Sequence, residues 1–193
     1  MASADFSGIA LVLLAAGQGT RFGGGKLAAP LAGEPVARHA AAMLGALPFA
    51  ARFAVVSPHT PDLGALGFGA LMLEPSGAPQ SRSLAIGVGA AQAMDARAVL
   101  VALADMPLVT SGHIEALVAS FDGKLIASSA AGRPMPPAIF AASYFPALGK
   151  LSGDRGAASL LAGAPSIAIS AAEALDIDYP ADLAKAEAQL ARR

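Results

Sequence analysis

Short apolar runs recur along the chain and are separated by longer stretches of helical character. Residues 9–14, 53–56 and 98–102 are apolar without polar alternation, which is typical of strands buried on both faces of a sheet. Weaker strands are predicted at 71–73, 125–127 and 167–169, and helices at 36–47, 83–94, 111–121, 156–161 and 181–192. Strands that alternate with helices predict an α/β fold whose mostly parallel sheet is covered on both faces.

Composition narrows the function classes. The 193 residues contain no long linker or repeat, so one domain, 1–193, is expected. The net charge of −1 argues against a nucleic-acid surface, and the absence of cysteine excludes disulfides and Cys-ligated zinc. The first eight residues lack the basic region of a signal peptide, and the longest apolar run, 9–16, is too short to cross a membrane. We therefore expect a cytoplasmic protein without membrane or nucleic-acid partners.

The loop that follows the first predicted strand combines small residues with two cations. It runs from Ala15 to Lys26, contains five glycines and carries Arg21 and Lys26. In open parallel sheets ligands bind beyond the carboxyl ends of the strands, and glycine-rich backbone can cradle an anion there. The pattern favours polyphosphate binding over an ordinary turn with two solvated charges.

Two better-known phosphate loops fit less well. A P-loop requires Ser or Thr after Gly-Lys, whereas Lys26 is followed by Leu27. The spacing Gly17-x-Gly19-x-x-x-Gly23 resembles a variant of the dinucleotide fingerprint, but the second strand ends at Ser57-Pro58-His59 without the required acid. A dinucleotide-binding module therefore remains the weaker alternative.

Acidic residues stand at two other strand ends. Asp105 follows the strand 98–102, and a carboxylate at this edge of a parallel sheet is a natural ligand for Mg²⁺, although it could also cap a turn. Asp178 precedes the Pro180 that begins the last helix and is the candidate second ligand, with a helix-entry turn as its alternative role. Asp182 is expected in the first turn of that helix, where it meets the helix dipole.

These residues together resemble a known family, the MobA-like nucleotidyltransferases, and most closely its molybdenum-cofactor cytidylyltransferase branch. The resemblance rests first on Leu14-Ala15-Ala16-Gly17-x-Gly19-x-Arg21-Phe22-Gly23-x-x-Lys26 and on Leu103-Ala104-Asp105-Met106-Pro107. It continues in collinear order through 137–140, 145–148, 151–157 and 176–183, and so covers nearly the whole chain.

The resemblance implies a three-layer α/β/α, Rossmann-like nucleotide-diphospho-sugar transferase fold. It implies transfer of CMP from CTP to the phosphate of molybdopterin cofactor with release of pyrophosphate, catalysed by Arg21, Lys26 and Asp105, with Mg²⁺ held by Asp105 and Asp178. The implied nucleotide-binding residues are Ala15, Ala16, Gly17, Gly19, Arg21, Lys26, Gly77, Arg82 and Ser83. Ala16 favours CTP over GTP, because guanylyl enzymes of the family more often carry Gly there.

The implied chemistry needs positioning and charge neutralisation rather than a general base. A phosphate monoester, with a second pKa of about 6, already presents an anionic oxygen. His39, His59 and His113 are accordingly expected to be structural or exposed.

The acceptor side is less well defined by the sequence. Asp154 and Arg155 are the implied acceptor contacts, and Asp154 could equally cap the helix 156–161. The branch commonly carries Arg at the position occupied here by Ala158. This departure leaves open GTP or another phosphorylated acceptor, such as a polyol or sugar phosphate. It also leaves open a non-catalytic chaperone that delivers the cofactor to a molybdoenzyme.

Overall fold

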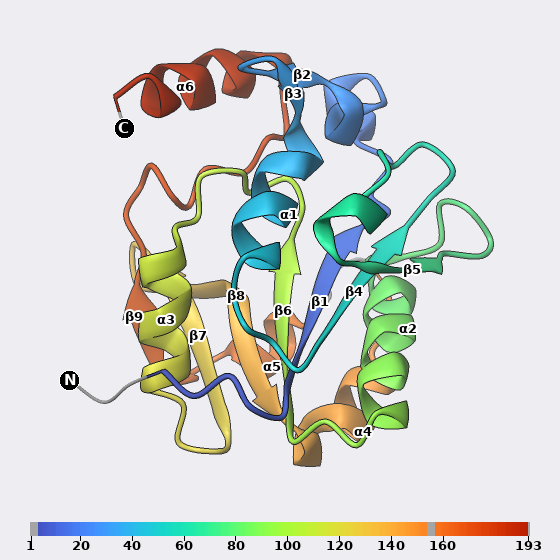
Figure 1. The fold of residues 1–193 in the computed structure, drawn as a ribbon, viewed down its shortest axis with the longest axis vertical. Helices are drawn as coiled ribbons and strands as arrows, with labels where there is room; N and C mark the ends of the chain where they lie inside the picture. Colours follow the sequence, from blue (N-terminus) through green and yellow to red (C-terminus); the bar gives the residue numbers. More distant parts are fainter. Residues whose placement is uncertain (1–3, 154–156, 193) are drawn as a thin grey trace.

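A seven-stranded sheet with the order β5-β4-β1-β6-β8-β7-β9 forms the centre of the protein, seen in Figure 1. The computed structural model describes residues 4–153 and 157–192. The strands of this sheet are β1 (Ile9–Ala15), β4 (Ala51–Val56), β5 (Gly69–Met72), β6 (Ala98–Leu103), β7 (Leu125–Ala130), β8 (Arg133–Ala141) and β9 (Ser166–Ala168). Two short strands, β2 (Pro30–Leu31) and β3 (Glu34–Pro35), pair with each other as a separate antiparallel hairpin.

Helices cover both faces of the sheet, which confirms the predicted three-layer arrangement. The α-helices are α1 (Val36–Gly45), α2 (Gln80–Ala93), α3 (Ser111–Ala119), α4 (Phe145–Gly149), α5 (Ala158–Leu161) and α6 (Pro180–Leu190). The buried residues of α1 and α3 pack on one face of the sheet, and those of α2, α4 and α5 pack on the other. None of the described helices has both the length and the apolarity needed to span a membrane.

Strand β1 shows why an uninterrupted apolar run belongs at the centre. Successive side chains of a strand point to opposite faces, so Ile9 and Leu11 join one core while Ala10 and Val12 join the other. β1 is paired in parallel with β4 on one side and with β6 on the other. The run therefore has no polar alternation because neither face of β1 meets water.

Strand β8 is the main feature that the sequence pattern did not predict. It runs antiparallel between β6 and β7, so the sheet is mostly rather than entirely parallel. Pro134, Pro136 and Pro137 interrupt its pattern, because proline lacks the N–H that a central strand donates. The pairing with β6 covers only Ala138 to Ala141, so the three prolines lie beyond the part of β8 that is hydrogen-bonded on both sides.

A third, smaller cluster closes the end of the sheet to which β1 and β6 point. It joins the β2–β3 hairpin to α6, which lie beside each other in Figure 1. Its buried members are Leu31, Val36, Leu108, Ile177 and Ala186. Since Leu108 follows Asp105 and Ile177 lies between two acidic residues, this cluster fixes the backbone that carries the predicted metal ligands.

Some element boundaries differ from the sequence prediction. Helix α2 begins at Gln80, three residues before the predicted start, and α1 ends at Gly45 rather than at 47. Helix α5 begins at Ala158, and residues 154–156 lie outside the described part of the chain. These differences fall at helix ends, where sequence patterns are least informative.

Candidate active site

A cavity of about 550 Å³ lies at the carboxyl ends of β1 and β6. Its walls come from the loop after β1, the start of α2, the end of β6 and the segment before α6. The residues singled out from the sequence that line it are Ala16, Gly17, Gly19, Arg21, Lys26, Gly77, Ser83, Asp105 and Asp178. The structure thus brings together side chains from four separate segments at the edge where parallel-sheet proteins bind ligands.

The glycine-rich loop is folded into two short 3₁₀ turns, Thr20–Phe22 and Lys26–Ala28. Gly19 and three later glycines have φ between 60° and 96°, a left-handed region that other residues rarely adopt. A Cβ placed on Gly19 would lie 2.8 Å from Cγ of Lys26. Glycine at this position therefore lets the stem of Lys26 pack against the loop and carry its ammonium group into the cavity.

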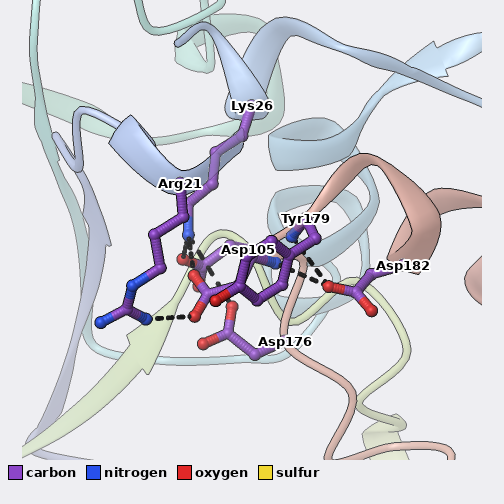
Figure 2. Close-up of polar contacts among 7 residues, drawn as sticks. Arg21, Lys26, Asp105, Asp176, Tyr179 and Asp182 are labelled. Carbon is purple, nitrogen blue, oxygen red and sulfur yellow. Dashed lines mark hydrogen bonds and ion pairs between the residues drawn. The ribbon is translucent and has the colours of Figure 1, made fainter. Parts of the chain in front are cut away.

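Lys26 lies at the centre of an acidic cluster, as Figure 2 shows. Its Nζ atom is 2.6 Å from Oδ2 of Asp105 and 3.1 Å from Oδ1 of Asp178, and it is 3.9 Å from Oδ1 of Asp176. Arg21 approaches from the same loop and donates from Nη1 to Oδ2 of Asp178 over 2.8 Å. Lys26 thus meets carboxylates that follow β6 and precede α6, whereas Arg21 meets Asp178 before α6.

The charges of this cluster shift the pKa values of its members in opposite directions. Burial disfavours the ammonium of Lys26, but Asp105 and the two other acids outweigh burial and raise its pKa. Burial likewise raises the pKa of Asp178, yet the hydrogen bonds from Lys26 and Arg21 outweigh that effect and the pKa is lowered. Lys26 therefore stays charged, and Asp178 stays ionised, at neutral pH.

Asp176 is a member of the site that the sequence reasoning did not single out. Burial, followed by the negative charge of Asp105, raises the pKa of Asp176 to about 7. The alternation Asp176-Ile177-Asp178 was the available signal: Ile177 is fully buried, so in an extended segment its two neighbours point away from the core together.

Two carboxylate oxygens in the cluster have no hydrogen-bond partner. Oδ1 of Asp105 and Oδ1 of Asp176 are both buried, and an unsatisfied buried carboxylate oxygen is unfavourable unless a cation meets it. Among the described residues, no group of three or more acidic or histidine side chains encloses a metal position. Two carboxylates with free buried oxygens nevertheless fit a divalent cation that takes its other ligands from phosphate and water.

The segment before α6 is held in place by its own hydrogen bonds. Oδ2 of Asp182 accepts from the backbone N–H groups of Asp178 and Tyr179, over 3.2 and 2.8 Å. Ile177 donates its N–H to the carbonyl of Asp105 over 2.9 Å. Asp182 does lie in the first turn of α6, as predicted, and the two acidic segments are joined directly.

Several predicted residues lie elsewhere. Ala15 is fully buried at the end of β1, where its carbonyl accepts a hydrogen bond from the Thr60 hydroxyl, and it does not line the cavity. Arg82 is exposed on the first turn of α2 and is likewise absent from the cavity lining, whereas Ser83, beside it, is buried and faces the cavity. Asp154 and Arg155 lie outside the described residues.

The histidines have separate environments. His39 Nε2 is 2.7 Å from the carbonyl oxygen of Leu31, which ties α1 to the β2–β3 hairpin. His113 is buried on α3 and contacts Ser128 of β7. His59 borders a second cavity on the other side of the glycine-rich loop.

Comparisons with known proteins agree with this arrangement. Residues 11–171 match the family model of the MobA-like NTP transferase domain. The purine catabolism protein PucB of Bacillus subtilis is 33% identical over 192 residues, covering 88% of this chain and 91% of PucB.

Two solved structures share the fold. The Methanothermobacter nucleotidyl transferase Mth528 superposes with a TM-score of 0.78 at 20% identity, covering 95% of this chain and 98% of that one. Rv0371c of Mycobacterium tuberculosis, solved in complex with manganese, gives a TM-score of 0.71 at 19% identity, covering 92% and 96% of the two chains. The family model matches residues 11–171, which is most of this chain, and the cavity lies at the strand ends where such enzymes bind ligands. The chain therefore belongs to the MobA-like NTP transferase family and is a nucleotidyltransferase.

Proposed function

We propose that this nucleotidyltransferase transfers CMP from CTP to the phosphate of molybdopterin cofactor and releases pyrophosphate. One observation carries the proposal: Lys26 and Arg21, on a glycine-rich loop, share a cavity with Asp105, Asp176 and Asp178. Cations on a glycine-rich loop suit a triphosphate, and facing carboxylates suit the divalent cation that accompanies it.

The side chains act by binding and neutralising two anions. On nucleotide binding, Lys26 and Arg21 transfer their contacts from the carboxylates to the phosphate oxygens, which offer charge-assisted hydrogen bonds of the same kind. An oxygen of the acceptor's phosphate then forms a bond to the α-phosphorus. The bond from the α-phosphorus to its bridging oxygen breaks, and the electron pair leaves with pyrophosphate. Positioning and electrostatics supply the catalysis, as in other phosphoryl transfers.

Asp105 is the proposed principal ligand for Mg²⁺. Asp176 fits as its partner, because Oδ1 of each is buried without a hydrogen bond. Asp178, the second ligand expected from the sequence, has both oxygens engaged by Lys26 and Arg21, and it would be free to hold the metal only if those cations turned to phosphate. A bound Mg²⁺ would neutralise negative charge on the phosphates.

The preference for CTP rests on the wall that faces the base. Ala16 and Ser83 line the cavity beside Gly77, and both Ala16 and Ser83 are buried. A methyl group at position 16 reduces the room available to a larger purine. The assignment of molybdopterin as the acceptor rests on the resemblance of the sequence motifs to the family. One assay tests the nucleotide and the acceptor together.

The test measures pyrophosphate release with Mg²⁺, with CTP, GTP or ATP, and with molybdenum cofactor as acceptor. CTP is expected to give the highest kcat/KM, and Asp105→Asn is expected to lower kcat by about 10²-fold or more, since it removes an ionic contact in the site. Glu115→Gln, on the exposed face of α3, is the control and should keep the wild-type rate.

The assay distinguishes three ways in which the proposal could be wrong. Nucleotide binding without pyrophosphate release from any nucleotide would replace the transferase proposal with a cofactor chaperone. A faster reaction with GTP would overturn the nucleotide assignment alone. An unchanged rate in Asp105→Asn would reduce Asp105 to a structural cap.

A further inference from the structure

The two acidic segments of the active site differ in how firmly the fold holds them. Asp105 lies in the loop between β6 and α3, and Leu108 of the same loop is fully buried. Asp176 and Asp178 lie in residues 169–179, a stretch that the structure describes in full and that forms no helix or strand between β9 and α6. Side chains on an irregular segment keep a fixed geometry only if further contacts hold that segment. A contact that fixes residues 169–179 relative to Asp105 therefore bears directly on the metal site.

Glu173 makes such a contact, and it uses both oxygens of its carboxylate. Oε2 accepts a hydrogen bond from the hydroxyl of Ser170 over 2.7 Å, and the Ser170 oxygen accepts from the backbone N–H of Glu173 over 3.2 Å, which closes the turn within the segment. Oε1 accepts from the hydroxyl of Thr110 over 2.5 Å, at the start of α3, where the two segments lie beside each other in Figure 1. Glu173 thus joins two parts of the chain that are 63 residues apart in sequence.

Thr110 is a well-fixed partner, because its hydroxyl also caps α3. The hydroxyl oxygen accepts from the backbone N–H of His113 over 3.3 Å, while its hydrogen is donated to Glu173. Burial raises the pKa of Glu173, but the hydrogen bonds from Thr110 and Ser170 outweigh that effect and lower the pKa. Glu173 is therefore an ionised acceptor at neutral pH, and its bond to Thr110 is charge-assisted.

Asp176 lies between two points at which its segment is anchored to the Asp105 loop. Before it, Glu173 binds Thr110; after it, Ile177 donates its N–H to the carbonyl of Asp105 over 2.9 Å. Between these anchors, Oδ1 of Asp176 is buried without a hydrogen-bond partner, as is Oδ1 of Asp105. Neither Glu173 nor Thr110 lines the large cavity. The pair is thus placed to set the position of a metal ligand without touching the contents of the cavity.

We propose that Glu173 is a positioning residue, whose bond to Thr110 holds the two acidic segments at the separation that a shared divalent cation requires. The proposal rests on the metal site of the transferase function proposed above. Outer partners that orient metal ligands typically contribute about 10- to 100-fold to metal affinity. A purely structural role, in which Glu173 only closes its own turn, predicts a loss of stability with no change in metal affinity.

Binding of Mn²⁺ in the absence of nucleotide and acceptor tests the positioning without requiring turnover. Electron paramagnetic resonance measures the Kd of Mn²⁺, and the melting temperature of each variant reports its stability. Glu173→Ala removes both side-chain contacts and is expected to raise the Kd of Mn²⁺ about tenfold. Thr110→Val removes the bond from the other side and should raise the Kd by about the same factor, whereas Thr110→Ser keeps the hydroxyl and should keep the wild-type Kd.

Two further variants separate positioning from local stability. Ser170→Ala removes the bond that closes the turn but leaves the bond between Glu173 and Thr110, so the Kd of Mn²⁺ should stay at its wild-type value. The double variant of Thr110→Val and Glu173→Ala should bind Mn²⁺ as each single variant does, because both changes remove one and the same bond.

The results separate this proposal from the transferase function. Wild-type Mn²⁺ affinity in Glu173→Ala and Thr110→Val, with a lower melting temperature, would overturn the positioning alone, and so would an equal rise in Kd for Ser170→Ala and Thr110→Val. Absence of Mn²⁺ binding by the wild-type protein would overturn the metal site and the positioning together. Mn²⁺ affinity that depends on Glu173 and Thr110, without pyrophosphate release from any nucleotide, would support the positioning and reject the transferase function.

Discussion

At the scale of single residues, Lys26 is the side chain on which both the proposed metal site and the proposed nucleotide site depend. Its ammonium group contacts Asp105 and Asp178 and lies 3.9 Å from Asp176, so it neutralises the carboxylates proposed to hold metal. A divalent cation and the Lys26 ammonium would therefore share the same carboxylates, and their positive charges would repel each other there. Nucleotide phosphates, by contrast, offer Lys26 an alternative partner.

Lys26→Met is expected to move two affinities in opposite directions. Methionine keeps an unbranched stem that can pack beside Gly19 but removes the charge. The Kd of Mn²⁺ in the absence of nucleotide should fall about tenfold, because the competing ammonium is gone, and the Kd of CTP should rise about tenfold, because a phosphate contact is lost. Electron paramagnetic resonance of Mn²⁺ and calorimetry of CTP measure the two constants at pH 8, above the pKa of about 7 of Asp176.

Lys124→Met, an exposed lysine between α3 and β7, serves as the control and should change neither constant. Weaker Mn²⁺ binding in Lys26→Met would show that Lys26 supports the metal site instead of competing for it. Unchanged CTP binding would remove Lys26 from the phosphate contacts.

Residue types and spacing allowed much of this cluster to be predicted, but not its connectivity. Arg21, Lys26, Asp105 and Asp178 stand out because charge is rare in a chain with only 14% charged residues, and each of them follows or precedes a predicted element. No pattern along the chain states that Nζ of Lys26 reaches Asp105, since that contact depends on the left-handed turn at Gly19. Asp176 was missed because it was treated as one member of an acidic turn.

At the scale of elements, the contact between α2 and β1 sets how closely a helix can lie on this sheet. Gly87 is buried on α2, and a Cβ added there would lie 2.3 Å from Cγ1 of Val12 on β1. No neighbour lies within 4 Å of the equivalent point on Gly89, one of the exposed positions of the same helix. Both glycines lower the intrinsic helix propensity by the same amount, but only Gly87 is packed closely against a neighbouring strand.

Gly87→Ala is expected to lower the free energy of unfolding by about 1–3 kcal/mol, because the new methyl group overpacks the interface. Gly89→Ala is the matched control and should raise it by about 0.5–1 kcal/mol through helix propensity alone. Urea unfolding monitored by far-ultraviolet circular dichroism gives both values.

A double-mutant cycle with Val12→Ala identifies the contact. If Val12 is the obstacle, the cost of Gly87→Ala shrinks in the Val12→Ala background and the coupling differs from zero. Additive effects, or equal stability of the two glycine variants, would contradict the close approach of α2 to β1.

The prediction of elements succeeded where local pattern and tertiary setting agree. Strands β1 and β6 and residues 53–56 of β4 are apolar on both faces and were predicted from that property. Strand β8 was not predicted, because only its tertiary setting tolerates its prolines. The prolines precede Ala138, where the pairing with β6 begins, and the β7–β8 pairing shifts register beside them, at Ala127/Ser128. The periodicity of a sequence does not predict which strands will lie beside a given strand in the sheet.

At the scale of the whole molecule, the alternation of elements predicted the layers but not the order of the strands. The reversal of β8 between β6 and β7 is decided by non-local pairing, as is the third cluster that joins α6 to the β2–β3 hairpin. Loops after parallel strands could be expected to share one edge of the sheet, and they do.

The protonation of His113 makes the free energy of unfolding of the whole protein depend on pH. It is buried on α3, and its Nε2 lies 2.7 Å from Oγ of Ser128, which itself donates to the carbonyl of Pro137. Ser128 therefore accepts from a neutral imidazole that carries its proton on Nε2. Burial lowers the pKa of His113 below 6.5, although the negative charge of Glu173 partly opposes this effect.

Because the folded pKa of His113 is depressed, the unfolded state binds the proton more readily below pH 6.5, and the free energy of unfolding should fall as pH falls. Asp176 acts in the opposite sense: its pKa is about 7 in the folded state and 3.8 ordinarily, so its contribution rises as pH falls through 7. The difference between wild type and His113→Gln isolates the histidine, and urea unfolding from pH 8 to pH 5 measures it. His113→Gln should lose the histidine's acid-side decline while wild type retains it, and parallel pH profiles for the two proteins would show that His113 is protonated equally in both states.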